Sequence, residues 1–200
     1  MIDFIDFDEA VPSVVDVWLD ELADRVAPGW PPLLWPFQSG DSTPQTSRRH
    51  FLLLAASAGA GSLGLVGRRS HVERLTGSMV KQRLRAALFE VRSTNRHFHA
   101  VNCHEALHGN SFAAVSAAVR CLSDVEQAVK ALAAATAGPL STADGAVVLV
   151  SGRSARIAGD GAVQAFRALA ALDSAQFIVH GGYVCPKGEV PSVCLLVPIQ

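Results

Sequence analysis

Eight consecutive residues near the middle of the chain hold its densest set of reactive side chains. Residues 102–109 read Asn-Cys-His-Glu-Ala-Leu-His-Gly, with two imidazoles, a carboxylate and a thiol. In a helix, His104 and His108 lie four residues apart on one face, where two ring nitrogens can bind one metal ion with Glu105 beside them. The pair Gly109 and Asn110 comes next and favours a helix C-cap or a turn. The spacing therefore predicts a metal site close to the end of a helix, and the alternative is that His104 and His108 are ordinary polar positions near a helix end.

The five residues from His104 to His108 resemble the His-Glu-x-x-His motif of zincin metallopeptidases. The resemblance implies a zinc ion bound by His104 and His108. It also implies that Glu105 is the general base that takes a proton from the metal-bound water. The first hypothesis is therefore a zinc-dependent hydrolase, a small metallopeptidase that acts on a peptide or protein substrate.

A catalytic zinc site needs a third protein ligand and an open position for water. Similarity to the glutamate-type zincins places this ligand on the following helix, where Glu126 lies eighteen residues beyond His108. A His-x-His pair at His97 and His99 is a second source of ligands, and His180 is a third. Glu126 is the predicted ligand, and its alternative role is a first-turn carboxylate that stabilises the helix dipole.

A thiol mechanism is the second hypothesis. A cysteine at the start of a helix has its thiolate stabilised by the helix N-terminus, and a histidine on a later strand can act as its base. Cys103 with His180 resembles the layout of papain-like cysteine peptidases, with Asp173 or Glu189 as the orienting third group. The alternative is a half-buried cysteine and an ordinary turn histidine.

The charge distribution bears on partners. Residues 1–45 carry nine acids against Arg25 alone, and residues 46–100 carry ten Lys and Arg against two Glu, although the net charge is only −1. We expect the acidic segment to fold onto the basic one, because basic residues without interleaved aromatic ones are a poor nucleic-acid signature. A non-catalytic protein-interaction module, with residues 1–45 as the partner-binding segment, is the third hypothesis.

The sequence divides into three regions: an acidic helix and Pro/Trp-rich strap at 1–45, an apolar segment at 46–67, and a single domain at 68–200. Arg48 and Arg49 precede an uncharged run, so residues 46–67 resemble a twin-arginine export signal that contacts the membrane and the export machinery. The alternative is a core helix that begins at Ser47 in a cytoplasmic protein. In an exported protein, Cys185 and Cys194 could form a disulfide, and otherwise both are small buried hydrophobes.

Hydrophobic periodicity sets the expected order of elements. Helical spacing predicts helices over 14–26, 72–91, 111–124, 125–138 and 161–172, and apolar runs rich in β-branched residues predict strands over 146–150, 176–179 and 193–199. The expected class is α+β, with a helix-rich N-terminal two thirds followed by a small β-sheet with one intervening helix.

Overall fold

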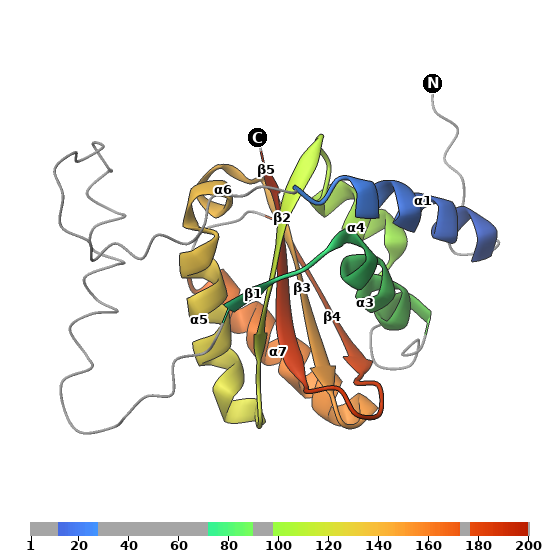
Figure 1. Ribbon diagram of the computed structural model, residues 1–200. Helices are drawn as coiled ribbons and strands as arrows, with labels where there is room; N and C mark the ends of the chain where they lie inside the picture. The colour runs from blue at the N-terminus through green and yellow to red at the C-terminus, as the bar shows by residue number, and fades with distance from the viewer. Residues whose placement is uncertain (1–11, 28–71, 90–97, 173–176, 200) are drawn as a thin grey trace, which may run out of the picture. The chain divides into compact units, whose positions relative to one another are not determined.

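The computed structural model describes residues 12–27, 72–89, 98–172 and 177–199 (Figure 1). All of them belong to one compact unit that comprises residues 1–30 and 70–200. The Pro/Trp-rich strap and the twin-arginine-like segment at 46–67 lie outside the described residues, as do His97 and Asp173. None of the helices that the structure describes is long and apolar enough to cross a membrane.

A five-stranded mixed sheet is the centre of the unit, so the predicted α+β class is confirmed (Figure 1). The strand order is β1-β2-β5-β3-β4, with β3 and β4 parallel and the other neighbours antiparallel. The strands are β1 (Val72–Arg74), β2 (Ser111–Ala118), β3 (Gly145–Gly152), β4 (Phe177–Val184) and β5 (Ser192–Ile199). The parallel pair is joined by a helical crossover, as parallel strands require.

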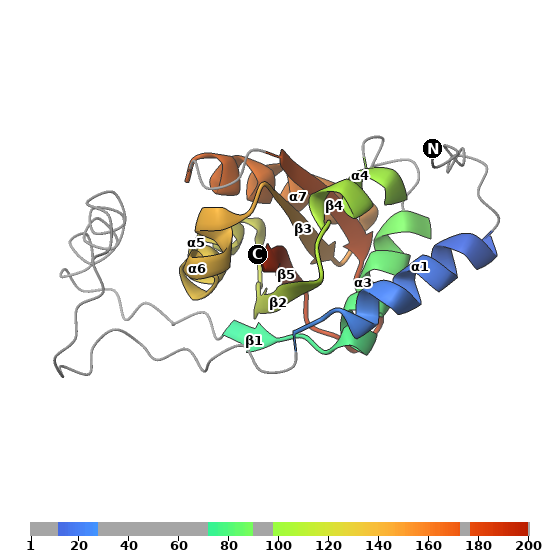
Figure 2. The same cartoon turned by 90° about the horizontal axis from the view of Figure 1, so that it is seen from above.

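Helices cover both faces of the sheet, as the view from above shows (Figure 2). One face carries α1 (Pro12–Asp24), α3 (Gly77–Phe89) and α4 (Ala100–Ala106), and the other carries α5 (Val125–Ala135), α6 (Ala137–Thr142) and α7 (Ala155–Ala170). A short 3-10 helix, Leu122–Asp124, precedes α5. Alternate residues of each strand therefore enter two different cores. In β5, Cys194 and Leu196 face α3, whereas Val193 and Leu195 face α5 and α7.

The crossover from β3 to β4 shows how the sequence produces this packing. All eight residues of β3 are buried, as expected for a central strand with helices on both sides. The Ser154 side chain then caps α7 by accepting a hydrogen bond from the Ile157 amide at 3.3 Å. A Cβ atom at Gly182 of β4 would lie 2.5 Å from the Ala158 carbonyl oxygen, so glycine lets α7 pack directly on the strand.

The helix predicted over 111–124 is wrong, because residues 111–118 form strand β2. Phe112 and Ala114 are buried in one core, and Val115 and Ala117 are buried in the other. A strand that is buried on both faces is apolar at every position, so helical intervals occur in it by coincidence. The helix predicted over 72–91 is shorter in the structure, because Val72–Arg74 is strand β1 and α3 begins at Gly77.

Candidate functional site

The His-Glu-x-x-His stretch does not form one continuous helix. Helix α4 ends at Ala106, and His108 lies two residues beyond it, with its Nδ1 atom 2.9 Å from the Glu105 carbonyl oxygen. Gly109 follows with a φ of 125°, a left-handed conformation that favours glycine, in the connection where the Gly109 and Asn110 signal predicted a turn. His108 therefore lies outside the helix that carries His104, and both residues are exposed.

Arg25 holds the segment that follows α4. Its Nη2 atom donates to the carbonyl oxygen of Leu107 at 2.6 Å and also to that of Gly109. A cation at these carbonyls satisfies acceptors that the end of a helix leaves without partners. The end of α1 therefore fixes the position of the loop that carries His108.

The predicted third zinc ligand lies elsewhere. Glu126 is in the first turn of α5, on the opposite face of the sheet from α4, and its carboxylate forms an ion pair with Lys130 at 2.7 Å. The Lys130 hydrogen bond and charge lower the pKa of Glu126. His99 is exposed at the start of α4. Among the described residues, no three His, Cys, Asp or Glu side chains form a group that could hold a metal ion.

The residues of the predicted thiol mechanism are also separated. Cys103 is fully buried in the core beneath α4, and this burial raises the pKa of its thiol instead of lowering it. His180 lies on the opposite face of β4, where its ring stacks on Phe166 of α7 at 4.8 Å. Glu189 is exposed in the loop between β4 and β5. The sheet therefore stands between the proposed nucleophile and the proposed base.

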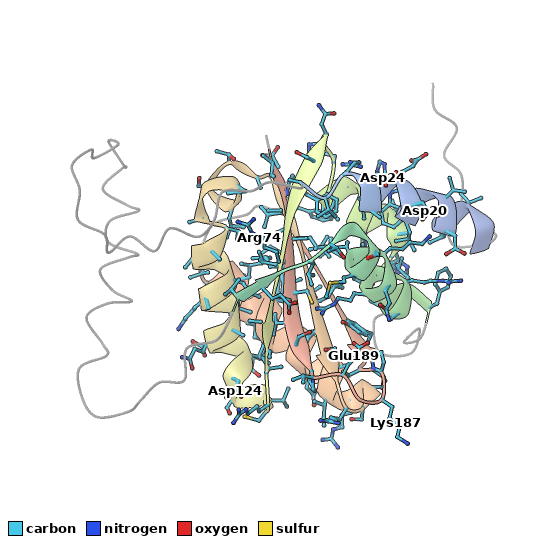
Figure 3. All side chains as sticks on the ribbon, in the orientation of Figure 1. Asp20, Asp24, Arg74, Asp124, Lys187 and Glu189 are labelled. Atoms are coloured by element: carbon cyan, nitrogen blue, oxygen red, sulfur yellow. The ribbon has the colours of Figure 1, made fainter. Side chains whose placement is uncertain are left out.

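A groove runs along α3 on the described surface. Its volume is about 580 Å³, within the usual range for a small-molecule site. Helix α3 forms one wall, and Tyr183 of β4 with Pro186 and Glu189 of the β4–β5 loop form the other. In Figure 3, α3 lies between the labelled Asp20 of α1 and the labelled Glu189. The α3 residues that line the groove are Ser78, Met79, Lys81, Gln82, Arg83, Arg85, Ala86 and Phe89.

Arg83 connects this groove, called the α3 groove below, with a polar cluster on the sheet. Its Nη1 atom donates to the Ser192 hydroxyl at 3.1 Å and also to the Cys194 sulfur. The Ser151 hydroxyl accepts a hydrogen bond from the Ser192 amide at 2.7 Å, which ties β3 to β5. Ser151 and Tyr183 are partners near the carboxyl ends of the parallel strands β3 and β4. Ligands of open α/β sheets bind beyond this edge.

The protonation states of the cluster leave Arg83 with its positive charge. Burial raises the pKa of Cys194 even though the Arg83 guanidinium opposes the shift, and burial also raises the pKa of Tyr183. Both groups are therefore neutral at physiological pH. Burial lowers the pKa of Arg83, but its interactions with Cys194, Tyr183 and Glu189 outweigh this effect and raise it. The cluster therefore presents a half-buried, permanent cation to the groove.

The two other cations of the groove are paired with α1. Lys81 binds Asp20, and the Arg85 Nε atom lies 3.3 Å from an Asp16 carboxylate oxygen. These pairs confirm that acidic residues of the N-terminal segment fold onto the basic segment. Arg83 differs from Lys81 and Arg85 because its hydrogen bonds go to a hydroxyl and a thiol.

The sequence contains a signal for the polar cluster around Arg83, but helical periodicity alone does not reveal it. Arg83 lies off the apolar stripe of the helix expected over 72–91, and periodicity gives no indication that a loop some hundred residues later would border it. The usable signal is alternation in β5, where Ser192 and Cys194 interrupt the apolar residues of one face only. Comparison with family models, curated protein sequences and solved structures finds no match.

Proposed function

We propose that this protein binds a small molecule with an oxyanion, such as a carboxylate or a phosphate ester, in the α3 groove. Arg83 is the anchoring cation. The single observation that supports this proposal is a half-buried guanidinium on the groove wall, positioned by neutral partners. A guanidinium whose hydrogen bonds go to a hydroxyl and a thiol keeps its charge and its remaining donors for an oxyanion, which it binds with high geometric specificity.

The hydrogen bonds of Arg83 indicate how the ligand would be held. Its bonds to Ser192 and Cys194 both come from Nη1. A guanidinium carries five N–H donors in a planar fork, so we expect Nη2 and Nε to meet the oxyanion. Tyr183, as a neutral phenol, can donate from the opposite wall. Glu189 at the rim can accept a hydrogen bond from a hydroxyl group of the ligand.

The test is calorimetric titration of the full chain with inorganic phosphate and with phenyl phosphate. Arg83→Gln should weaken binding by about tenfold or more, because it removes charge-assisted hydrogen bonds. Arg120→Gln is the matched control, since Arg120 is exposed in the connection after β2 and away from the groove. Equal binding by wild type and a folded Arg83→Gln variant would refute the proposal.

A zinc-dependent hydrolase is a second candidate. It is favoured by the exposure of His104, Glu105 and His108 within one short stretch, and by the Trp18 ring beside His104 at 6.4 Å. In this proposal His104 and His108 bind zinc and Glu105 acts as the base. Elemental analysis decides it, since a tightly held zinc ion should be lost from a His104→Ala, His108→Ala variant. The cysteine hydrolase is less well supported, because Cys103 is buried.

A further inference from the structure

Two cations of the α3 groove have a second role. Lys81 and Arg85 line the groove, and they also form the ion pairs with Asp20 and Asp16 of α1. Both acids lie outside the groove lining. The carboxylates of α1 therefore neutralise the cationic wall from its outer side, next to the space that a ligand would occupy.

The geometry of α1 makes this neutralisation specific. Asp16 and Asp20 are four residues apart, as are Lys81 and Arg85, so each pair lies on one face of its helix. The pairing of Asp16 with Arg85 and of Asp20 with Lys81 shows that the two helices run antiparallel. Buried apolar residues hold α1 against the core, so its carboxylates can be displaced from the cations without loss of the helix. These residues are Val15, Leu19 and Leu22.

We propose that Asp16 and Asp20 are built-in competitors for the outer anionic groups of the ligand, and that the ligand is a polyanion. This inference rests on the proposed oxyanion site at Arg83. One anionic group would bind Arg83, and further groups would replace the α1 carboxylates at Lys81 and Arg85. The chemical class is a small molecule with three or more anionic charges, such as a polyphosphate or a tricarboxylate.

The exposure of the ion pairs makes such an exchange accessible. The Asp20 and Arg85 side chains are 63% and 58% exposed, whereas those of Lys81 and Asp16 are 31% and 33% exposed, so water and salt screen both pairs in part. An exposed pair of this kind changes an equilibrium by a factor of about 1.5 to 5. Once one anionic group of the ligand is bound at Arg83, its other anionic groups are held close to Lys81 and Arg85. Their effective concentration there is high, which favours the ligand over the carboxylates of Asp16 and Asp20.

The experiment compares two double variants of equal charge by calorimetric titration with inorganic triphosphate and with inorganic phosphate. Asp16→Asn with Asp20→Asn should bind triphosphate roughly 2- to 25-fold more tightly than Glu21→Gln with Asp24→Asn. The control removes two charges from the same helix without touching either ion pair. Phosphate, which needs only Arg83, should bind both variants within about twofold.

A second comparison distinguishes competition for Lys81 and Arg85 from a general change in the electrostatic potential of the groove. The background for this comparison is a Lys81→Gln, Arg85→Gln variant. Adding Asp16→Asn and Asp20→Asn to that variant should not strengthen triphosphate binding. Equal triphosphate affinity of the two double variants would overturn the competitor role, as would a gain that persists in that background. If Arg83→Gln leaves phosphate and triphosphate binding intact, the oxyanion site itself is wrong. Failure of wild type and all variants to bind either probe would refute both proposals.

Discussion

Gly77 is the position at which a single methyl group should disturb the contact between α1 and α3. A Cβ atom there would overlap the Ala23 carbonyl oxygen and lie 2.8 Å from its carbonyl carbon. Ordinary contact begins near 3.4 Å, so the backbones must separate by roughly half an ångström or more. The obstructing atoms are backbone, which has no rotamer by which to move aside. The Gly77→Ala change therefore forces α1 away from α3 at the end nearest the loop after α4.

Overpacking of this kind costs about 1–3 kcal/mol, and the gain in helix propensity offsets at most about 1 kcal/mol at the first position of α3. We expect a loss of about 1–2 kcal/mol and a fall in Tm of about 2–8 °C. The assay is urea unfolding followed by far-UV circular dichroism. Gln82→Ala at an exposed position of the same helix is the control and should stay within about 0.5 kcal/mol of wild type. A Gly77→Ala protein as stable as wild type would refute the close approach of the two helices.

Two further predictions concern cysteine reactivity and pH. In the native protein a thiol alkylator should label Cys121 much faster than Cys103, because Cys121 is exposed and burial raises the pKa of the Cys103 thiol. Peptide mass mapping measures the order of labelling, and a reversed order would contradict the packing of α4. The backbone N–H of Arg120, which donates to the Asp124 carboxylate at 3.0 Å, and the Cys121 side chain lower the pKa of Asp124. Because the folded-state pKa is below the unfolded value, this contribution is present above about pH 4 and is lost as pH falls through the folded pKa. Asp124→Ala should therefore reduce the urea midpoint more at pH 7 than at pH 2, and a deficit that is equal at both values would exclude this cause.

The elements with strong local signals were predictable from the sequence. The apolar run at 146–150 corresponds to β3, and the helical spacing at 125–138 corresponds to α5, whereas α6 continues through Gly138 and Pro139, where the helix was expected to end. β2 was not predictable in this way, because a strand packed on both faces has no alternation to distinguish it from a helix. The Gly109 and Asn110 pair did predict where α4 ends. That local signal outweighed the expectation that residues 104–108 would stay helical.

The groove depends on contacts between distant segments, and local pattern contains little information about them. Arg83 meets Ser192 and Cys194 across more than a hundred residues of chain. Periodicity could show only that Arg83 lies off the apolar stripe of its helix. Which neighbour it meets depends on strand β5 lying between β2 and β3, and sequence order alone did not indicate that insertion. The charge asymmetry was informative because it is a property of whole segments, and it correctly anticipated the ion pairs between α1 and α3.

The most direct test of the central claim is to locate the oxyanion on the folded protein by nuclear magnetic resonance. The backbone amide resonances of the isotope-labelled full chain are followed during titration with inorganic phosphate. We expect saturable shifts concentrated at Gln82, Arg83, Tyr183 and Glu189, and none of comparable size in α5 or α7. Shifts that centre on the opposite face of the sheet, or that leave α3 unchanged at saturation, would contradict the account.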